Sequence, residues 1–393
     1  MKLSKLWFLF FIAGCVAILV SGALRFQNPE SNDFEAFFEA SNHFLNMETP
    51  YLDWVERPYK YPPVATILIS PLALMEGSVA RRLLLSLDVL ATLFNIFLCW
   101  RLFQGTWRPR TREMWTHFYR ANCFAILCSL RFLDNEYHSK NLNQISYTLI
   151  LLGLLLIRQY RYPLWGLLLS GWGSFIKLTP LMAFWTYVGL PLKQHLSKVF
   201  LALLILMFLP WPTMWIDWIQ QMRATTGAFP LDETLFFQGF FPFVAHFLNV
   251  ASRSSATLLF ALPLILYTLW KLPRFDVNTL FACSQSAWRQ FLQAQFLLIL
   301  FSLTLNPLPW QHLYGFLLIF VAGSCYARQS SPPPLTTLAC LILGLSSRGI
   351  VGETISVAFE QHQGIFLCVL VIFWENLQEL IRKLEKPSSQ VTA

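Results

Sequence analysis

Long apolar runs recur along almost the whole chain, and they limit its possible folds more than any other feature. Hydrophobic residues make up 55% of the 393 residues, charged residues only 13%, and the mean hydropathy is +0.50. A soluble protein carries about twice that charged share. Apolar runs of this length are typical of helices that cross a lipid bilayer. The sequence therefore predicts an all-α polytopic integral membrane protein.

We predict about 12 transmembrane helices, counting one segment, 163–191, as a hairpin of two. The first apolar run lacks a good cleavage site, so we expect it to remain as the first helix. The spans belong to one transmembrane domain, 1–381, followed by a basic, disordered cytoplasmic tail, 382–393. The predicted spans lie near 6–24, 81–103, 116–133, 144–158, 163–191, 198–214, 240–271, 288–306, 312–328, 334–350 and 363–381.

The distribution of charge predicts the orientation. With both termini in the cytoplasm, most of the 29 Lys and Arg residues fall on the cytoplasmic side and most of the 21 carboxylates on the outer side. The positive-inside rule describes this bias. We therefore expect a multi-pass protein of the plasma membrane whose basic loops lie beside anionic lipids. The net charge of +8 is explained by these loops, and we expect no nucleic acid as a partner.

The connection between the first two spans, residues 25–80, is long and acidic. It contains eight of the 21 carboxylates, and connections of this length are uncommon without a function. The amphipathic stretch from Phe34 to Leu45 predicts a surface helix. Residues 63–76 are apolar but too short to cross the membrane, and they predict an interfacial helix. We expect this outer loop to carry the active site.

Asp33 lies at the start of the amphipathic stretch, where two compatible roles are open to it. Asn32 or Asp33 can cap the helix, because Asn and Asp are strong N-cap residues. The positive end of the helix dipole also favours an ionised aspartate. An ionised carboxylate within reach of a hydroxyl is what a general base requires. Our hypothesis is that Asp33 is the catalytic base of an extracytoplasmic active site.

Proline and aromatic residues stiffen the second half of the loop. Tyr61 precedes Pro62 and Pro63, and each proline restricts its own backbone and that of the residue before it. One interpretation is a rigid corner leading into the interfacial helix. The other adds an aromatic wall, with Tyr51 beside the corner, that suits a sugar face on the acceptor side.

Three polar residues lie near the predicted outer ends of later spans. Lys177, among apolar residues, either snorkels to the interface or pairs with an anion such as a phosphate. His312 either bonds a backbone carbonyl or donates to an oxyanion from a ring nitrogen. Arg348 either anchors its helix at the interface or recognises an anion. The topology puts all three residues at one depth in the membrane, which predicts that they share one anion-binding pocket.

These motifs follow one another in an order that resembles glycosyltransferase family 87. The chain departs from the family's pattern at Asn143, Pro309, Leu313 and Gly349. The resemblance covers most of the chain in order and is carried by Asp33-Phe34, Pro50-Tyr51, Tyr61-Pro62-Pro63, Ser70-Pro71-Leu72, Asn143-Gln144, Lys177-Leu178-Thr179-Pro180, residues 306–312 and Arg348-Gly349-Ile350-Val351-Gly352.

The resemblance implies a GT-C-like bundle and an inverting hexosyltransferase. The donor would be a polyprenyl-phosphate sugar, most often mannose, and the acceptor a lipid or a glycan at the extracytoplasmic face. Asp33 would be the general base by matching position. The resemblance also places Gln144 and Trp310 with Lys177, His312 and Arg348 around the donor phosphate and sugar.

No cofactor is expected, because the donor is itself a lipid-linked substrate with a good leaving group. The large loop contains no Asp-x-Asp pair, which favours a reaction without a divalent metal. A polytopic transporter or a lipid-linked-sugar flippase is the alternative function. It accounts for the spans and for Lys177, but it leaves the acidic loop without a role, and the two halves of the chain show no internal repeat.

Overall fold

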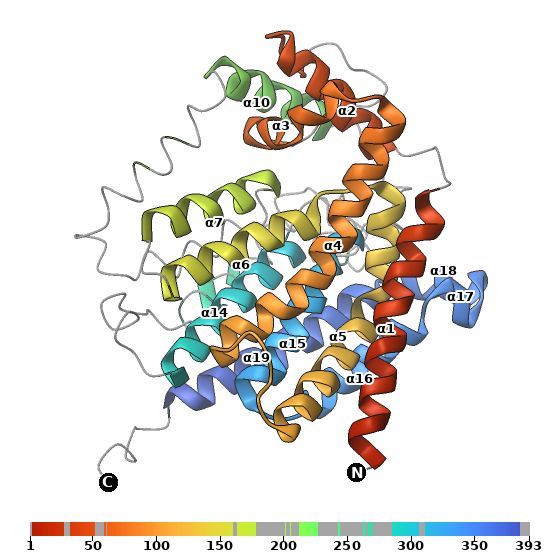
Figure 1. The fold of residues 1–393 in the computed structure, drawn as a ribbon, viewed down its shortest axis with the longest axis vertical. Helices are drawn as coiled ribbons and strands as arrows, with labels where there is room; N and C mark the ends of the chain where they lie inside the picture. The colour runs from red at the N-terminus through yellow and green to blue at the C-terminus, as the bar shows by residue number, and fades with distance from the viewer. Residues whose placement is uncertain are drawn as a thin grey trace.

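The computed structural model describes residues 2–26, 32–51, 59, 61–159, 163–177, 212–226, 285–305 and 311–385, with a few single positions between 201 and 270. Every regular element in this part of the chain is a helix, which confirms the predicted all-α class. Figure 1 shows the helices packed as one bundle, with a smaller group of helices at one end.

The helices fall into two sets, those of the bundle and those of the connections. The bundle contains α1 (Lys2–Phe26), α4 (Gly77–Gln104), α5 (Arg112–Ser139), α6 (Asn143–Gln159), α7 (Pro163–Lys177), α14 (Gln285–Thr304), α15 (Leu317–Arg328), α16 (Pro334–Leu345) and α19 (Gly364–Glu385). The connections contain α2 (Asn32–Leu45), α3 (Pro63–Ile69), the 3-10 helix η1 (Ser70–Leu74), α10 (Thr213–Thr226), the 3-10 helix η4 (Gln311–Phe316), α17 (Arg348–Val351) and α18 (Glu353–Gln361).

Three of the described helices are long and apolar enough to cross a membrane alone: Ser4–Phe26, Gly77–Gln104 and Gly364–Leu384. The pair α5 and α6 meets the same criterion together, as a broken span or a re-entrant loop bent by 114°. The count of about 12 spans stays a prediction. The predicted spans at 198–214 and 240–271, and the second half of the hairpin 163–191, lie mostly outside the described residues.

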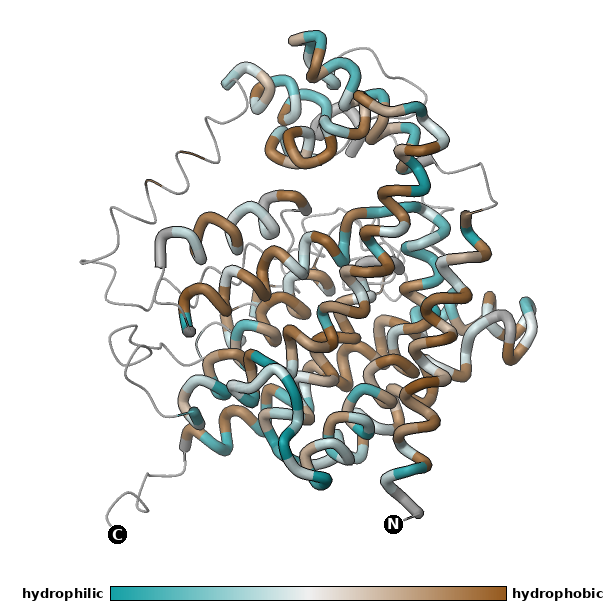
Figure 2. The backbone as a smooth tube through the Cα atoms, viewed as in Figure 1, coloured by the Kyte–Doolittle hydropathy of each residue, from teal (hydrophilic) through white to brown (hydrophobic). Residues whose placement is uncertain are grey.

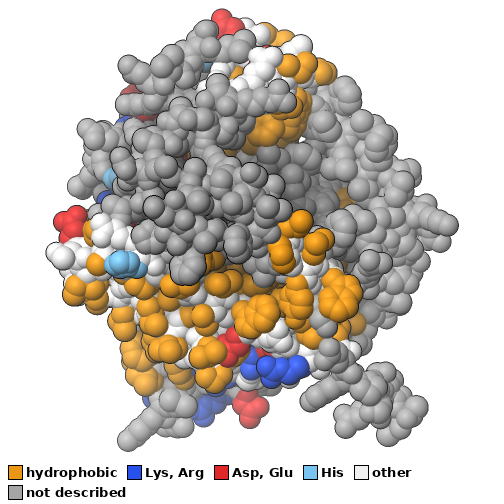
Figure 3. All heavy atoms as spheres, turned by 180° about the vertical axis from the view of Figure 1, so that it is seen from behind, with side chains coloured by type: hydrophobic (Ala, Val, Ile, Leu, Met, Phe, Trp, Pro, Cys, Tyr) orange, Lys and Arg blue, Asp and Glu red, His pale blue; other side chains and the backbone are white. Residues whose placement is uncertain are grey.

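Hydrophobic residues predominate in the middle of the bundle, and hydrophilic residues gather toward its two ends, as the colouring of the backbone in Figure 2 shows. The same band is visible from behind, where hydrophobic side chains gather above a group of Lys, Arg and carboxylate side chains (Figure 3). This arrangement is expected of helices surrounded by lipid, whose ends meet water.

Close packing of α6 against α7 depends on small residues. A Cβ added at Gly153 would lie 2.5 Å from the carbonyl oxygen of Gly166 and would also meet Ser170. About two turns away along the same two helices, Ser146 Oγ of α6 donates to the carbonyl of Gly173 in α7 at 2.5 Å. Small residues of this kind let two helix backbones approach within a membrane. The seam holds α7 in place beneath the first loop.

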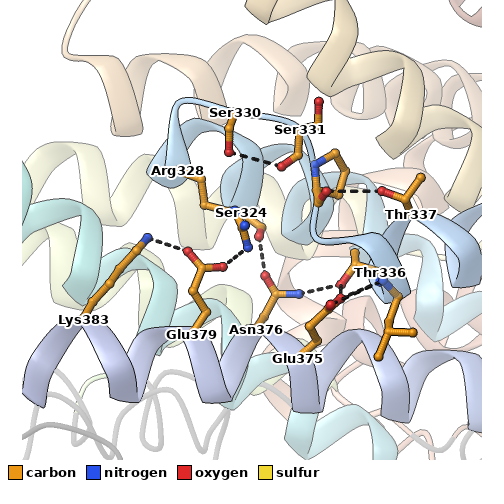
Figure 4. A network of polar contacts seen from close by, with 12 residues as sticks. Ser324, Arg328, Ser330, Ser331, Thr336, Thr337, Glu375, Asn376, Glu379 and Lys383 are labelled. Carbon is orange, nitrogen blue, oxygen red and sulfur yellow. Dashed lines mark hydrogen bonds and ion pairs between the residues drawn. The ribbon is translucent and has the colours of Figure 1, made fainter.

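A polar network ties α15, α16 and α19 together (Figure 4). Glu375 accepts the backbone N–H of Thr336 at 2.6 Å and so satisfies a donor at the start of α16. Glu379 pairs with Arg328 and, at 2.8 Å, with Lys383. This last pair lies within α19, which continues to Glu385. Residues 382–385, predicted as the start of the tail, are therefore helical.

The first loop forms a cap at the end of the bundle that lies opposite the start of α1 and the end of α19 (Figure 1). The predicted surface helix is confirmed as α2, and the predicted helix at 63–76 is divided into α3 and η1 at Ser70, where Pro71 follows. The buried residues of this cap and of the segments packed against it, here called the loop cluster, are Phe34, Phe37, Ala40, Tyr51, Tyr59, Ala65, Ile69, Leu72, Ala80, Leu84, Leu142, Ile176 and Met214.

Candidate active site

Asp33 lies in the first turn of α2, which begins at Asn32 in the described chain. The alternative that Asp33 itself is the cap is therefore wrong, because the residue is already inside the helix. Phe34 and Phe37 are fully buried in the loop cluster and fix the orientation of α2. The Asp33 carboxylate, half-buried, remains at the N-terminal end of the helix, where the dipole favours its charged form.

The carboxylate of Asp33 is hydrogen-bonded by a residue that the sequence analysis did not single out. Asn141 Nδ2 donates to Asp33 Oδ2 at 2.7 Å. Asn141 lies in the break between α5 and α6, and its Oδ1 accepts the hydroxyl of Tyr61 at 3.2 Å. One amide therefore joins the predicted base to the predicted aromatic corner.

The corner at Tyr61 holds the two prolines directly at the start of α3, and its aromatic residues are packed more deeply than a sugar-binding wall requires. Tyr51 is fully buried, and its hydroxyl donates to the carbonyl of Tyr61 at 2.9 Å. Pro62 and Pro63 are buried as α3 begins. Tyr61 alone is half-buried, with its ring 4.7 Å from that of Phe37. Tyr51 and the two prolines thus build the loop, and Tyr61 faces the region of Asp33.

The pKa of Tyr61 matters for this arrangement. Burial, first, and the negative charge of Asp33, second, hold the pKa of Tyr61 well above its ordinary value. The hydroxyl therefore keeps its proton at physiological pH and acts as the donor to Asn141.

The break between α5 and α6 is shaped by Glu136, which is fully buried. Its carboxylate accepts the backbone N–H of Gln144 at 2.9 Å and the Gln144 side-chain amide at 3.1 Å. Asn95 of α4 donates to the side-chain oxygen of Gln144 at 3.2 Å. Gln144, predicted as a donor-sugar ligand, is thus enclosed by protein groups at the start of α6. Its contact with a sugar stays a prediction.

The segment that carries His312 packs against Glu136 and Gln144. A Cβ added at Gly315 in η4 would lie 2.8 Å from both Gln144 Nε2 and Glu136 Oε2, so the glycine permits the close approach. The backbone of His312 is in η4, but its side chain lies outside the described residues, as does all of Trp310. The structure brings the backbone of the predicted donor segment to the α5–α6 break.

Lys177 is the last residue described in α7, and its side chain lies outside the described residues. Its neighbour Ile176 is buried in the loop cluster, and Trp172 Nε1 donates to the carbonyl of Val64 in α3 at 3.2 Å. The end of α7 therefore lies directly under the first loop. This places the backbone of Lys177 on the side of the bundle that carries Asp33.

Arg348 begins α17, and its side chain also lies outside the described residues. Two residues earlier, Ser346 Oγ accepts from Arg131 of α5 at 2.8 Å. Arg131 also pairs with Glu360 of α18 at 2.5 Å, with both side chains almost fully buried. The residue two positions before Arg348 is thus tied to α5 at Arg131. Its membership of one pocket with Lys177 and His312 stays a prediction.

Charged residues around the cap are arranged in pairs. Glu35 of α2 accepts from Arg81 of α4 at 2.5 Å, and Asp134 of α5 pairs with Arg25 of α1 at 2.7 Å. These pairs fasten α2 to α4 and α1 to α5 at the end of the bundle that carries Asp33. Among the described residues, no three His, Cys, Asp or Glu side chains lie close enough to hold a metal ion.

A polar run at 134–144 was the sequence signal for the residues that were missed. It contains Asp134, Glu136 and Asn141 within the short connection between the spans predicted at 116–133 and 144–158, directly before Gln144. Ionisable and amide groups at such a position are costly unless they serve a site or a fold. The partners of this run, however, come from α1, α2, α4 and the Tyr61 corner, and only the folded chain reveals them.

Comparison with known proteins identifies the family. The family model named glycosyltransferase family 87 matches residues 59–282, more than half of the chain. The matched region includes Tyr61, Gln144 and Lys177, whereas Asp33 and His312 lie outside it. No curated protein and no solved structure matches the chain. The chain belongs to glycosyltransferase family 87 and is a membrane glycosyltransferase.

Proposed function

We propose that this glycosyltransferase moves a hexose, mannose in the first instance, from a polyprenyl-phosphate donor to a lipid or glycan acceptor. The reaction takes place at the extracytoplasmic face of the plasma membrane and inverts the anomeric carbon. The observation that carries the proposal is the setting of Asp33. A half-buried carboxylate, bonded by Asn141, lies in a cap of short helices at one end of an apolar bundle.

Asp33 acts as the general base in a single displacement. Its carboxylate takes the proton from an acceptor hydroxyl while that oxygen bonds to the anomeric carbon of the donor sugar. The bond between the anomeric carbon and the phosphate oxygen breaks in the same step, and its electron pair leaves with the polyprenyl phosphate. Attack from the face opposite the leaving group inverts the configuration. The products are the glycosylated acceptor, a protonated Asp33 and free polyprenyl phosphate.

The donor phosphate is assigned to Lys177, His312 and Arg348, with Gln144 and Trp310 near the donor sugar. Positive groups in a site that excludes water stabilise the charge that builds on the phosphate as the bond breaks. Two observations support this assignment. The end of α7 lies against the loop cluster, and η4 packs on the Glu136–Gln144 pair. Arg348 is assigned from its sequence motif alone.

The proposed reaction uses no cofactor and no metal ion. Polyprenyl phosphate is a good leaving group once its charge is balanced, so a base and a set of positive donors suffice. The prenyl chain of such a donor is insoluble in water, which gives a reason for an enzyme with an apolar bundle beneath its active site. Membrane lipids are therefore its immediate surroundings, and the sugar and the acceptor hydroxyl meet under the cap.

The proposal is tested by product analysis with the purified, full-length protein in lipid nanodiscs. The reaction contains tritium-labelled polyprenyl-phosphate mannose and a total membrane-lipid extract as the source of acceptors. We expect label to pass into a new glycolipid or glycan, and the α or β configuration of the new bond to be opposite to that of the donor. A parallel reaction with a labelled nucleotide mannose should give no product.

Two outcomes contradict the proposal. Transfer from the nucleotide sugar but not from the lipid-linked sugar would show a different donor class. Movement of the lipid-linked sugar across the bilayer of a sealed vesicle, with no new glycosidic bond, would favour the flippase alternative.

A further inference from the structure

We infer that Asn141 is a positioning residue for Asp33. Its side-chain amide holds the carboxylate of the proposed base in one orientation and in its charged form. The inference rests on the proposed function, because it gives Asn141 a part in the same reaction. The two residues are 108 positions apart in the chain, and their side chains meet between the first turn of α2 and the break between α5 and α6.

The orientation of the Asn141 amide follows from its neighbours. The backbone N–H of Leu142 donates to Asn141 Oδ1 at 2.8 Å, and the hydroxyl of Tyr61 donates to the same oxygen at 3.2 Å. A backbone N–H can only donate, so the atom that faces it must be the amide oxygen. The NH₂ group then faces Asp33 Oδ2, at 2.7 Å. The carboxylate receives a donor at the distance typical of charge-assisted bonds.

The backbone of Asn141 is fixed on both sides by Glu136. The N–H of Asn141 donates to the carbonyl of Glu136 at 3.2 Å and closes the last turn of α5. The carboxylate of Glu136 accepts the backbone N–H of Gln144 at 2.9 Å and so holds the start of α6. One buried residue thus sets both arms of the 114° bend that carries Asn141. Such support is what gives a catalytic group a defined position.

The amide affects both the direction and the charge of the base. An ionised carboxylate has about four acceptor positions, and the bond from Asn141 occupies one of them on Oδ2. This bond restricts rotation of the carboxylate and directs its remaining lone pairs. A donor on the carboxylate also favours the charged form over the protonated one. Both effects act on the proton-transfer step, and neither requires Asn141 to touch the donor or the acceptor.

The test is a double-mutant cycle with Asn141→Ala, Asp33→Asn and the combined variant, measured with tritium-labelled polyprenyl-phosphate mannose and membrane-lipid acceptors. Asn141→Ala should lower kcat roughly 10- to 100-fold, the worth of one hydrogen bond to a charged group. Its KM for the donor should stay within about twofold of the wild-type value, because Asn141 does not contribute to binding of the donor in the ground state. The combined variant should be no slower than Asp33→Asn alone, since Asn141 acts only through Asp33.

Asn122→Ala is the matched control. Asn122, which lies in α5, is a buried amide like Asn141, and its Nδ2 donates to the Tyr326 hydroxyl at 2.6 Å and to the Phe118 carbonyl at 2.8 Å. The control therefore removes a comparable set of bonds in the half of α5 that is distant from Asn141. Both alanine variants should lower the thermal midpoint in detergent, whereas only Asn141→Ala should lower kcat.

Each contrary result has its own meaning. Wild-type kcat in Asn141→Ala, beside a loss in Asp33→Asn, overturns this inference and leaves the proposed base in place. The inference is also overturned if the fold-loss of kcat in the combined variant equals the product of the two single fold-losses. An equal loss of kcat in Asn122→Ala overturns it as well. Wild-type kcat in Asp33→Asn overturns the proposed base and this inference together.

Discussion

At the scale of single residues, two interactions support Asp33 as a charged group, and a third residue supports one of them. It lies in the first turn of α2, where the helix dipole favours an anion, and Asn141 donates to its carboxylate at 2.7 Å. Tyr61 acts indirectly by donating to Asn141. Because burial and Asp33 both raise the pKa of Tyr61, this hydroxyl remains a donor even in mildly alkaline solution. The bond from Tyr61 to Asn141 therefore persists from neutral to mildly alkaline solution.

Single residues differ in how far the sequence could predict them. Asp33 is marked by its residue type and by its place at the start of an amphipathic stretch. Asn141 carries no such mark, because its importance depends on the bend that brings the α5–α6 break to α2. Gln144 was selected from a family motif, yet the structure surrounds it with Glu136 and Asn95, partners that no local pattern reveals.

At the scale of elements, helix positions follow from hydrophobic length, but contacts between helices do not. The span predicted at 81–103 is observed as α4, Gly77–Gln104. The segment predicted at 144–158 is observed as the helix α6, Asn143–Gln159, which is apolar and long enough to cross a membrane only together with α5. By contrast, α10 was not predicted. Its residue Met214 is fully buried in the loop cluster, so packing with α3, and not local periodicity, accounts for its position.

The seam between α6 and α7 gives a prediction at this scale. Gly153→Ala places a methyl group 2.5 Å from the carbonyl oxygen of Gly166, too close for either backbone to remain where it is. The two helices must separate, and we expect a clear fall of the thermal midpoint in detergent together with weaker retention of α7 beneath the loop. Overpacking of this kind costs about 1–3 kcal/mol.

Gly105→Ala is a useful comparison for the seam. Gly105 follows α4 with φ 74°, and a Cβ there meets one side-chain atom at 4.0 Å, so its cost is conformational and not steric. The seam variant should lower transfer activity as well as stability, whereas Gly105→Ala should lower stability alone. Unchanged stability and activity in Gly153→Ala would contradict the close packing of α6 on α7.

At the scale of the whole molecule, the cap formed by α2, α3 and α10 lies at the end opposite both the start of α1 and the end of α19 (Figure 1). This arrangement is expected if the chain crosses the membrane an odd number of times between each terminus and the cap. The charge distribution predicts that the cap lies on the extracytoplasmic side, because the basic loop after α4 lies at the other end.

Accessibility labelling tests this orientation. In a background with all eight native Cys replaced, a Cys at the exposed position Glu48 should react with an impermeant thiol reagent applied to intact cells. A Cys at the exposed position Arg110 should react only after lysis. The reverse pattern would put the cap in the cytoplasm and contradict an extracytoplasmic active site.

The central claim is that Asp33 is the base of glycosyl transfer, and the most direct measurement compares Asp33→Asn with Glu35→Gln. Each variant replaces one carboxylate of the first turn of α2 by its amide. Glu35 is paired with Arg81, so its loss should affect stability more than rate. We predict that Asp33→Asn lowers the rate of transfer from polyprenyl-phosphate mannose ~100-fold or more at unchanged thermal stability, while Glu35→Gln stays within a few-fold of wild type. Near wild-type transfer by Asp33→Asn would contradict the account.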